Sequence, residues 1–169
     1  MPKLLLFAAC EKVLIDKDNI ISLISLLQDL QVQVPKTESK PESDSVIPMK
    51  WDVLSIWRRT DDDEGKTYEQ RIELVGPTGD VKVQVSVASF EVSSSSGFHR
   101  VIASIIGFPI GATGLYTVRL WLTEKGQQEG QPLAEYPITV VYDSATASSN
   151  PSPAAISPAP PSSQLPFAS

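Results

Sequence analysis

The chain has one histidine, and the residues around it limit the catalytic chemistry available. His99 lies next to Phe98 and Arg100 in a stretch that we predict to be a strand. Nucleophilic catalysis by a triad needs a histidine beside an exposed serine, and the G-x-S-x-G turn that presents such a serine does not occur. We therefore predict that His99 lies on a strand surface, that there are no catalytic residues and that the protein is not an enzyme.

Metal and cofactor sites also lack their usual ligands. Cys10 is the only cysteine and His99 the only histidine, so a zinc site built from nitrogen and sulfur ligands cannot be assembled. Neither the G-x-x-x-x-G-K-[ST] nor the G-x-G-x-x-G phosphate-binding motif occurs. The sequence predicts no cofactor and no metal.

Two groups of acidic residues suggest further chemistry. The run DDDE at residues 61–64 could supply oxygen ligands to calcium, but it lacks the spacing of an EF-hand loop. We favour the alternative of a solvated hairpin tip, in which case calcium leaves the melting temperature unchanged. Glu69 and Glu73 flank Arg71 on one strand face. For them we predict an exposed ladder of alternating charge and not a catalytic carboxylate pair.

The three tryptophans fall into two groups by parity. Trp51 and Trp57 share one face of a predicted strand, which places them in the core. Trp121 lies on the polar face of its strand beside Arg119, and an outward tryptophan next to an arginine is typical of an interface anchor. Arg119 and Trp121 are therefore the predicted binding residues. The alternative is that a loop, or the segment at residues 20–34, covers Trp121.

Composition argues against several partners and compartments. The 169 residues include 14 Lys+Arg and 20 Asp+Glu, for a net charge of -6, so we expect no nucleic-acid binding. No stretch reaches the roughly 20 apolar residues of a membrane helix, so we expect no membrane association. One cysteine cannot form an intramolecular disulfide, which favours a reducing, cytoplasmic location.

The first residues, MPKLLLFAAC, allow two interpretations. They have the outline of a bacterial lipoprotein signal, but their apolar run is shorter than the roughly 7 to 15 residues that such signals contain. The run also continues into EKVLI without a break. We favour a first strand over residues 4–15, central in its sheet or covered on both faces because its early part is mostly apolar.

Alternation of apolar and polar residues predicts about eight strands between residues 4 and 142. The clearest signal is the closing hairpin at residues 114–142, in which YTVRLWLT and PITVVY flank a turn with two glycines. The run at residues 20–34 fits both helical spacing and alternation, and we predict a strand with a bulge near Gln28 and Asp29. Strands at this spacing without helices predict an all-β, antiparallel, immunoglobulin-like β-sandwich.

The other strands are expected at residues 46–59, 67–74, 81–92 and 98–106, with residues 107–111 closing the last of them. The predicted core includes Val83, Val85, Val118, Leu120, Ile138 and Val140.

The chain is expected to divide at residue 142. Residues 1–142 form the sandwich domain, whereas residues 143–169 consist mainly of proline, serine and alanine, and Asp143 is their only charge. Such a segment cannot bury enough apolar area to offset its ordering entropy. We predict a disordered C-terminal tail that is dispensable for folding.

Several motifs resemble a family of uncharacterised bacterial and archaeal proteins, a domain of unknown function, over residues 1–142. They are LLLFAACEKVLID, MKWDVLSIWRR, GKTYEQRIELVGPTGD, GLYTVRLWLTEKG and EYPITVVY. The resemblance implies a compact cytoplasmic β-sandwich and brings no catalytic or ligand residues. The closing hairpin is also similar to the last two strands of many immunoglobulin-like sandwiches, which is a resemblance of fold only.

Two classes of function follow from these residues. The first is a non-catalytic protein-binding or assembly module that meets a protein partner, or a second copy of itself, through a sheet face or edge. The alternative is a small-ligand-binding or enzymatic sandwich with a site in the end loops. The first is favoured because no loop gathers the residue types that a catalytic site needs.

Overall fold

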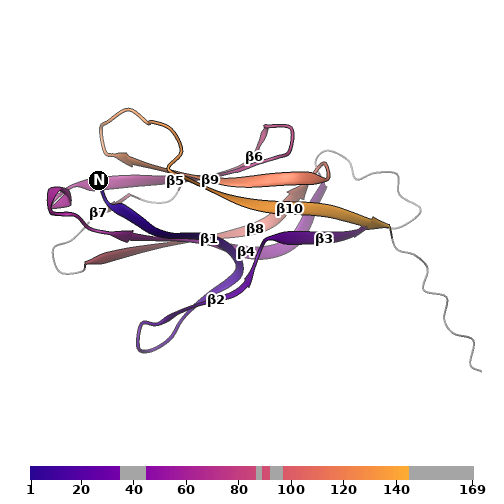
Figure 1. Cartoon of the computed structure of the whole chain (residues 1–169), viewed down its shortest axis with the longest axis horizontal. Helices are drawn as coiled ribbons and strands as arrows, with labels where there is room; N and C mark the ends of the chain where they lie inside the picture. The colour runs from indigo at the N-terminus through magenta and orange to yellow at the C-terminus, as the bar shows by residue number, and fades with distance from the viewer. Residues whose placement is uncertain (35–44, 87–88, 92–96, 145–169) are drawn as a thin grey trace, which may run out of the picture.

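The computed structural model describes residues 1–34, 45–86, 89–91 and 97–144, in which it has ten strands and one short 3₁₀ helix, η1 (Asp61–Asp63). The strands form two sheets that pack face to face (Figure 1). The predicted all-β sandwich is confirmed. The predicted tail lies, from residue 145 onward, outside the described residues.

The smaller sheet has four strands in the order β2-β1-β4-β8, and every pair of neighbours is antiparallel. These strands are β1 (Lys3–Ile15), β2 (Ile21–Leu26), β4 (Ser45–Arg58) and β8 (Phe98–Ile110). On β4, Trp51 and Trp57 point into the core, as their parity predicted. The residues between them on the other parity therefore point to the outside of the sandwich.

The larger sheet has six strands, five of them in the order β3-β10-β9-β5-β6, while the short β7 pairs with β5. They are β3 (Asp29–Val34), β10 (Ala134–Ser144), β9 (Gly114–Glu124), β5 (Thr67–Val75), β6 (Val81–Ser86) and β7 (Phe90–Glu91). The predicted closing hairpin is the β9–β10 pair. One pair departs from the antiparallel prediction, since β3 runs parallel to β10.

The ambiguous segment at residues 20–34 is extended, as predicted, but it forms two strands in different sheets. Leu27 is buried between them, its N–H donates to the Ala9 carbonyl at 3.0 Å, and Thr139 N–H donates to the Gln28 carbonyl at 2.7 Å. The predicted bulge near Gln28 is thus the point where the chain crosses from the smaller sheet to the larger one. This split, together with that between β6 and β7, accounts for ten strands where about eight were expected.

The second half of β1 separates from β4. β1 pairs with β4 as far as Cys10, and beyond that residue it pairs with β2. The Val13 N–H donates to Asp52 Oδ2 at 2.9 Å, and Arg100 on β8 donates to the Asn19 carbonyl at 3.0 Å. The hairpin of residues 11–26, which we call the arm, therefore folds back over the outer side of the four-stranded sheet (Figure 1).

The arm corrects one prediction about the first strand. β1 was expected to be central or covered on both faces. It lies between β2 and β4, but it is not covered on both faces, since Leu5, Leu6, Leu14 and Ile15 are all exposed. Leu5 lies at a shift in register with β4, between Leu4 and Leu6, and Leu14 and Ile15 belong to the arm. In this chain, apolar residues at both odd and even positions therefore do not mean that the strand is buried on both faces.

The core lies between the sheets and matches most of the predicted residues. Val118, Leu120, Ile138 and Val140 are fully buried, as are Trp51 and Trp57. Val83 and Val85 pack against this core but are only partly buried, because β6 lies at the edge of its sheet.

Hydrogen bonds between buried side chains join the two sheets. The Trp57 indole N–H donates to Gln70 Oε1 at 2.9 Å, and the Ser55 hydroxyl donates to the same oxygen at 2.7 Å. Trp57 and Ser55 lie on β4, whereas Gln70 lies on β5 of the other sheet. Because a buried polar group without a partner costs free energy, these bonds favour one alignment of β4 over β5.

Strand β8 is longer than predicted, because residues 107–110 continue it instead of closing it. Gly107 has a φ of +85° beside a shift in the β4–β8 register, and its carbonyl accepts a hydrogen bond from the Trp51 indole at 3.1 Å. Phe108 is fully buried, with its ring centroid 5.6 Å from that of Trp51. A Cβ on Gly107 would lie 2.7 Å from Val46 Cγ1.

We predict that Gly107→Ala lowers the free energy of unfolding by at least about 2 kcal/mol, because alanine is strained at this φ and also meets Val46. Gly126→Ala is the matched control, since Gly126 has a φ of +88° but no atom within 4 Å of its Cβ position. It should cost only about 1 kcal/mol. Equal losses in urea denaturation would show that the contact with Val46 relaxes freely.

Candidate functional site

The predicted binding residues Arg119 and Trp121 lie on the outer face of the six-stranded sheet. Arg71 is opposite Trp121, and Glu73 is opposite Arg119. Arg119 is also opposite Glu135 on β10 and donates to it at 2.9 Å. Rows of alternating charge therefore run across this face.

Trp121 is not exposed, contrary to the expectation of an outward anchor. Only 8% of the residue is accessible, and the Arg71 guanidinium lies 3.9 Å from the centre of its ring. Arg71 is ion-paired with Glu73 and makes two hydrogen bonds, of 2.8 and 2.7 Å, to Glu129. Stacking of Arg71 on the indole is a cation–π contact that the two carboxylates hold in place.

The predicted charge ladder of β5 is exposed only in part. Glu69 is exposed, but Glu73 is 8% accessible because it is ion-paired with Arg71. Glu129 belongs to the connection between β9 and β10, which reaches back to Arg71. No sequence pattern indicates that contact, since 58 residues separate the two partners.

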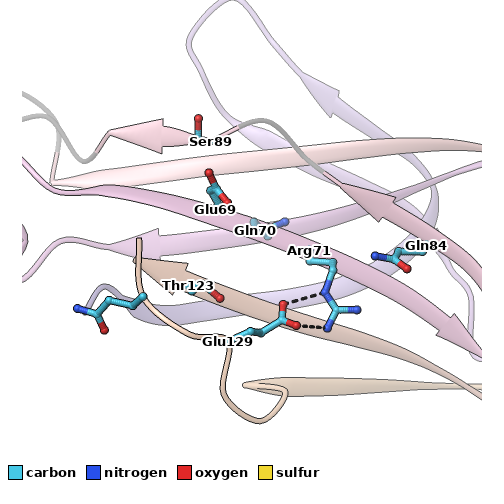
Figure 2. A pocket seen from close by; sticks show the side chains of 8 residues that line it. Glu69, Gln70, Arg71, Gln84, Ser89, Thr123 and Glu129 are labelled. Carbon is cyan, nitrogen blue, oxygen red and sulfur yellow. Dashed lines mark hydrogen bonds and ion pairs between the residues drawn. The ribbon is translucent and has the colours of Figure 1, made fainter. Parts of the chain in front are cut away.

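A hollow of about 650 Å³ lies beside Arg71 on this face. In Figure 2 the side chains around it come from β5, β6, the residue before β7, β9 and the β9–β10 connection. It is lined by Glu69, Gln70, Arg71, Gln84, Ser89, Thr123, Gln127 and Glu129. Carboxylates, amides, hydroxyls and a guanidinium of this kind can hydrogen-bond a polar molecule.

The arm and the outer side of the four-stranded sheet form a second surface. Five large apolar residues of the arm are exposed, with Ile20 at 62% and Leu26 at 49% the most accessible. The five are Leu14, Ile15, Ile20, Ile24 and Leu26. Ile106 on β8 points outward and is 86% exposed. We call the arm, together with the outward side chains of β1, β4 and β8, the outer surface.

The middle of this sheet lies under the arm. Asp52 and Leu54 point outward from β4, yet both are buried. Asp52 accepts hydrogen bonds from the Val13 N–H at 2.9 Å and the Ser104 hydroxyl at 2.6 Å. Cys10 is buried next to Asp52, and burial, followed by the negative charge of Asp52, raises the pKa of its thiol. The thiol is therefore neutral and poorly reactive at neutral pH.

The acidic run differs from a solvated tip at one residue. Asp63 is fully buried, whereas its neighbours Asp61, Asp62 and Glu64 are exposed. Asp63 Oδ2 accepts from the Thr60 N–H and hydroxyl, at 2.8 and 2.6 Å. Oδ1 accepts from the Tyr68 hydroxyl at 2.6 Å and lies 2.9 Å from the amino group of Met1.

These contacts make Asp63 a structural carboxylate. Burial alone would raise the pKa of Asp63, but the hydrogen bonds outweigh it and hold the pKa well below its ordinary value of 3.8. Burial and the adjacent Asp63 raise the pKa of Tyr68. Within the described residues, no three His, Cys, Asp or Glu side chains are placed so that they could hold a metal ion.

His99 lies on β8 and is half-buried. Its ring stacks on that of Phe90, with centroids 4.1 Å apart and planes 9° apart. Burial lowers the pKa of His99, so the ring is neutral at pH 7. His99 lies on a strand, as predicted, but it is opposite the inward Trp57 and faces Phe90 of the other sheet, so the predicted position on the strand surface is wrong.

We predict that Asp63→Asn lowers the free energy of unfolding at pH 7 by about 2 to 4 kcal/mol, because it removes a charged acceptor of several buried hydrogen bonds. The folded-state pKa lies below 3.8, so this stabilisation is present above about pH 4 and is lost as the pH falls further. The difference between the two proteins should shrink below pH 4. Thermal melts of both proteins from pH 7 to pH 2.5 measure this difference in stability, with the exposed Asp62→Asn as the control. A difference that stays constant over that range contradicts the assignment of Asp63 as a structural carboxylate.

Comparisons with known proteins add little to this picture. No protein-family model matches the chain, and no curated protein matches it. Among solved structures it is similar to the N-terminal domain of PorA, at 10% sequence identity, covering 81% of this chain and 97% of that one, with a TM-score of 0.31. No helix in the described part of the chain is long and apolar enough to span a membrane.

Proposed function

We propose that the protein is a non-catalytic protein-binding module that contacts its partner through the outer surface, with the arm at the centre of the contact. One observation carries the proposal: the arm exposes large aliphatic side chains at Leu14, Ile20, Ile24 and Leu26, and the register places Leu14, Ile24 and Leu26 on one face of the hairpin, while Ile15 is exposed on the other. Adjacent exposed apolar residues are the usual mark of a surface that another molecule covers. Burial of one such side chain contributes about 1.5 to 3 kcal/mol.

The fixed position of the arm adds to this proposal. Its two sides are tied to the sheet by Asp52 and Arg100, and Asp16 Oδ1 accepts the Asp18 and Ile20 N–H groups at 2.9 and 2.8 Å in the turn. A binding segment that is already ordered loses little conformational entropy when a partner binds. The arm is thus better prepared for recognition than a free loop of the same composition.

The predicted contact through Arg119 and Trp121 is retained as a second candidate. Arg119 is partly exposed, but it is paired with Glu135, and Trp121 lies under Arg71. A partner on that face has to displace existing ion pairs before it reaches the indole, which makes the face a poorer choice than the arm. A small ligand in the hollow beside Arg71 is the alternative function, supported by the polar side chains around it.

The same proposal includes the finer expectations from the sequence. They are an immunoglobulin-like relationship, kinship with the uncharacterised bacterial and archaeal family, and action in the cytoplasm. The buried, unpaired thiol of Cys10 supports a reducing compartment, since a neutral buried thiol needs no disulfide to be stable. None of these expectations is needed for the contact through the arm.

A photo-crosslinking amino acid at Ile20 tests the contact in the full-length protein in its source cell. The matched control position is Leu115, which is 54% exposed on the six-stranded sheet. The partner crosslinked at position 20 is then purified, and its affinity is measured for Ile20→Asp/Ile24→Asp, Leu115→Asp and Trp121→Ala.

We expect the arm variant to bind at least about 10-fold more weakly, because two buried anchors of an interface together contribute more than about 1.4 kcal/mol. Leu115→Asp should bind as the parent does. Unchanged affinity of the arm variant contradicts the proposal. A loss in Trp121→Ala alone assigns the contact to the Arg119–Trp121 face instead, and crosslinks between two copies identify self-association.

A further inference from the structure

The outer face of the four-stranded sheet has a charge opposite to that of the whole molecule. Residues of β4 and β8 on the parity opposite to Trp51 and Trp57 point outward, and the register places Lys3 of β1 beside Arg58 on that face. Four cations are found there: Lys3, Lys50, Arg58 and Arg100. Outside the arm, the one carboxylate among the outward side chains of β1, β4 and β8 is Asp52, and it is buried. The arm adds Glu11, Asp16 and Asp18 against Lys12 and Lys17, so the positive charge is that of the sheet and not of the arm. The chain as a whole has a net charge of -6.

These cations have no acidic partner in the part of the chain that the structure describes. No ion pair joins Lys3, Lys50 or Arg58 to a described carboxylate, and Arg100 donates to the neutral Asn19, at 3.0 Å to its carbonyl and 3.1 Å to its side-chain oxygen. On the other sheet the opposite holds, because Arg71 and Arg119 are both paired with glutamates. The cationic side chains of the outer face are therefore available to carboxylates of another molecule.

The cations lie next to exposed apolar side chains. Lys50 is opposite Ile106 in the β4–β8 register, and Arg100 is opposite Ile56. Ile106 is 86% exposed, and Leu6, beside Ile56 on β1, is also exposed. A ligand for this surface therefore needs apolar groups and negative charges within a few residues of one another.

We infer that the outer surface recognises a protein segment that combines apolar side chains with Asp or Glu. This inference rests on the proposed function and names the chemistry of its partner. Carboxylates on such a segment pair with the four cations, while its apolar side chains cover Ile106 and the arm. Opposite charges that meet at an interface mainly set specificity and the rate of association.

Two other occupants fit the charges less well. A second copy that met the same face across a twofold axis would bring these cations against their own counterparts, which is unfavourable. An anionic lipid surface is larger than the face and would meet the field of the whole molecule, whose net charge of -6 repels it. A short acidic segment meets the local cations without that penalty, because salt screens charges beyond about 8 to 10 Å.

Two synthetic peptides test the inference on the full-length protein. Both have leucine at alternate positions, and the intervening positions are glutamate in one peptide and lysine in the other. Fluorescence anisotropy at low salt should give at least about 10-fold tighter binding of the glutamate peptide, and added salt should reduce the difference. Vesicles of phosphatidylserine form a third arm, and we expect weaker binding to them.

The variants separate charge from apolar contact. Lys50→Glu should weaken the glutamate peptide and strengthen the lysine peptide, whereas Lys125→Glu, in the β9–β10 connection, changes the net charge equally and should change neither. Ile106→Asp should weaken binding of the glutamate peptide.

If both peptides bind equally and only Ile106→Asp weakens binding, the charge inference is wrong while the proposed apolar contact stands. Binding of neither peptide, or of the vesicles alone, overturns the inference.

Discussion

The hydrogen bonds from Trp57 and Ser55 to Gln70 fix how the two sheets of this sandwich are placed. They are buried in an otherwise apolar core, where an unpaired donor or acceptor costs about 1 to 3 kcal/mol. A slip of one residue in β4 or β5 would break them and turn every side chain of the strand to the other face. The identity of the outward residues therefore follows from these bonds. Lys50 and Arg58 point out of the smaller sheet, and Arg71 out of the larger one, because Trp57 and Gln70 point in.

The outer faces of the two sheets differ in whether their charged side chains are paired with one another. On the six-stranded sheet, arginines lie between glutamates, and Arg71 covers Trp121. The arginines of that face already have acidic partners within the chain, so they need none from another molecule. On the four-stranded sheet, the cations lie among exposed aliphatic groups, and Arg100 contacts an arm whose own isoleucines and leucines are exposed. Long basic side chains can rest their apolar stems on such a surface while their charges stay accessible, so this face combines both kinds of contact that a protein partner uses.

Periodicity predicted the strands well because each has one face in the core, and this is the property that alternation measures. Val118, Leu120, Ile138 and Val140 were placed correctly for that reason. Three features depend on contacts distant in sequence and could not be found in that way. Trp121 is covered by Arg71, which Glu73 and Glu129 hold in place. Residues 20–34 are divided because Leu27 enters the core, and β1 folds back where Asp52 and Arg100 anchor the arm. A signal for the arm was present, since residues 13–15 and 20–27 are apolar on both parities. At residues 20–27, however, that pattern fits helical spacing as well as alternation, so it does not by itself indicate an exposed hairpin.

The exposed aliphatic side chains of the arm are informative because charged side chains at the same positions would make the protein more soluble. β2 is the end strand of its sheet, where charged residues usually discourage association with other chains. In this chain Ile20, Ile24 and Leu26 occupy those positions, and the charged residues of the arm lie mostly in its turn. Lysines at the three positions would make the arm more soluble while leaving its anchors at Asp52 and Arg100 unchanged. An arm that keeps its aliphatic side chains next to unpaired cations is therefore better explained by contact with a partner than by the needs of folding.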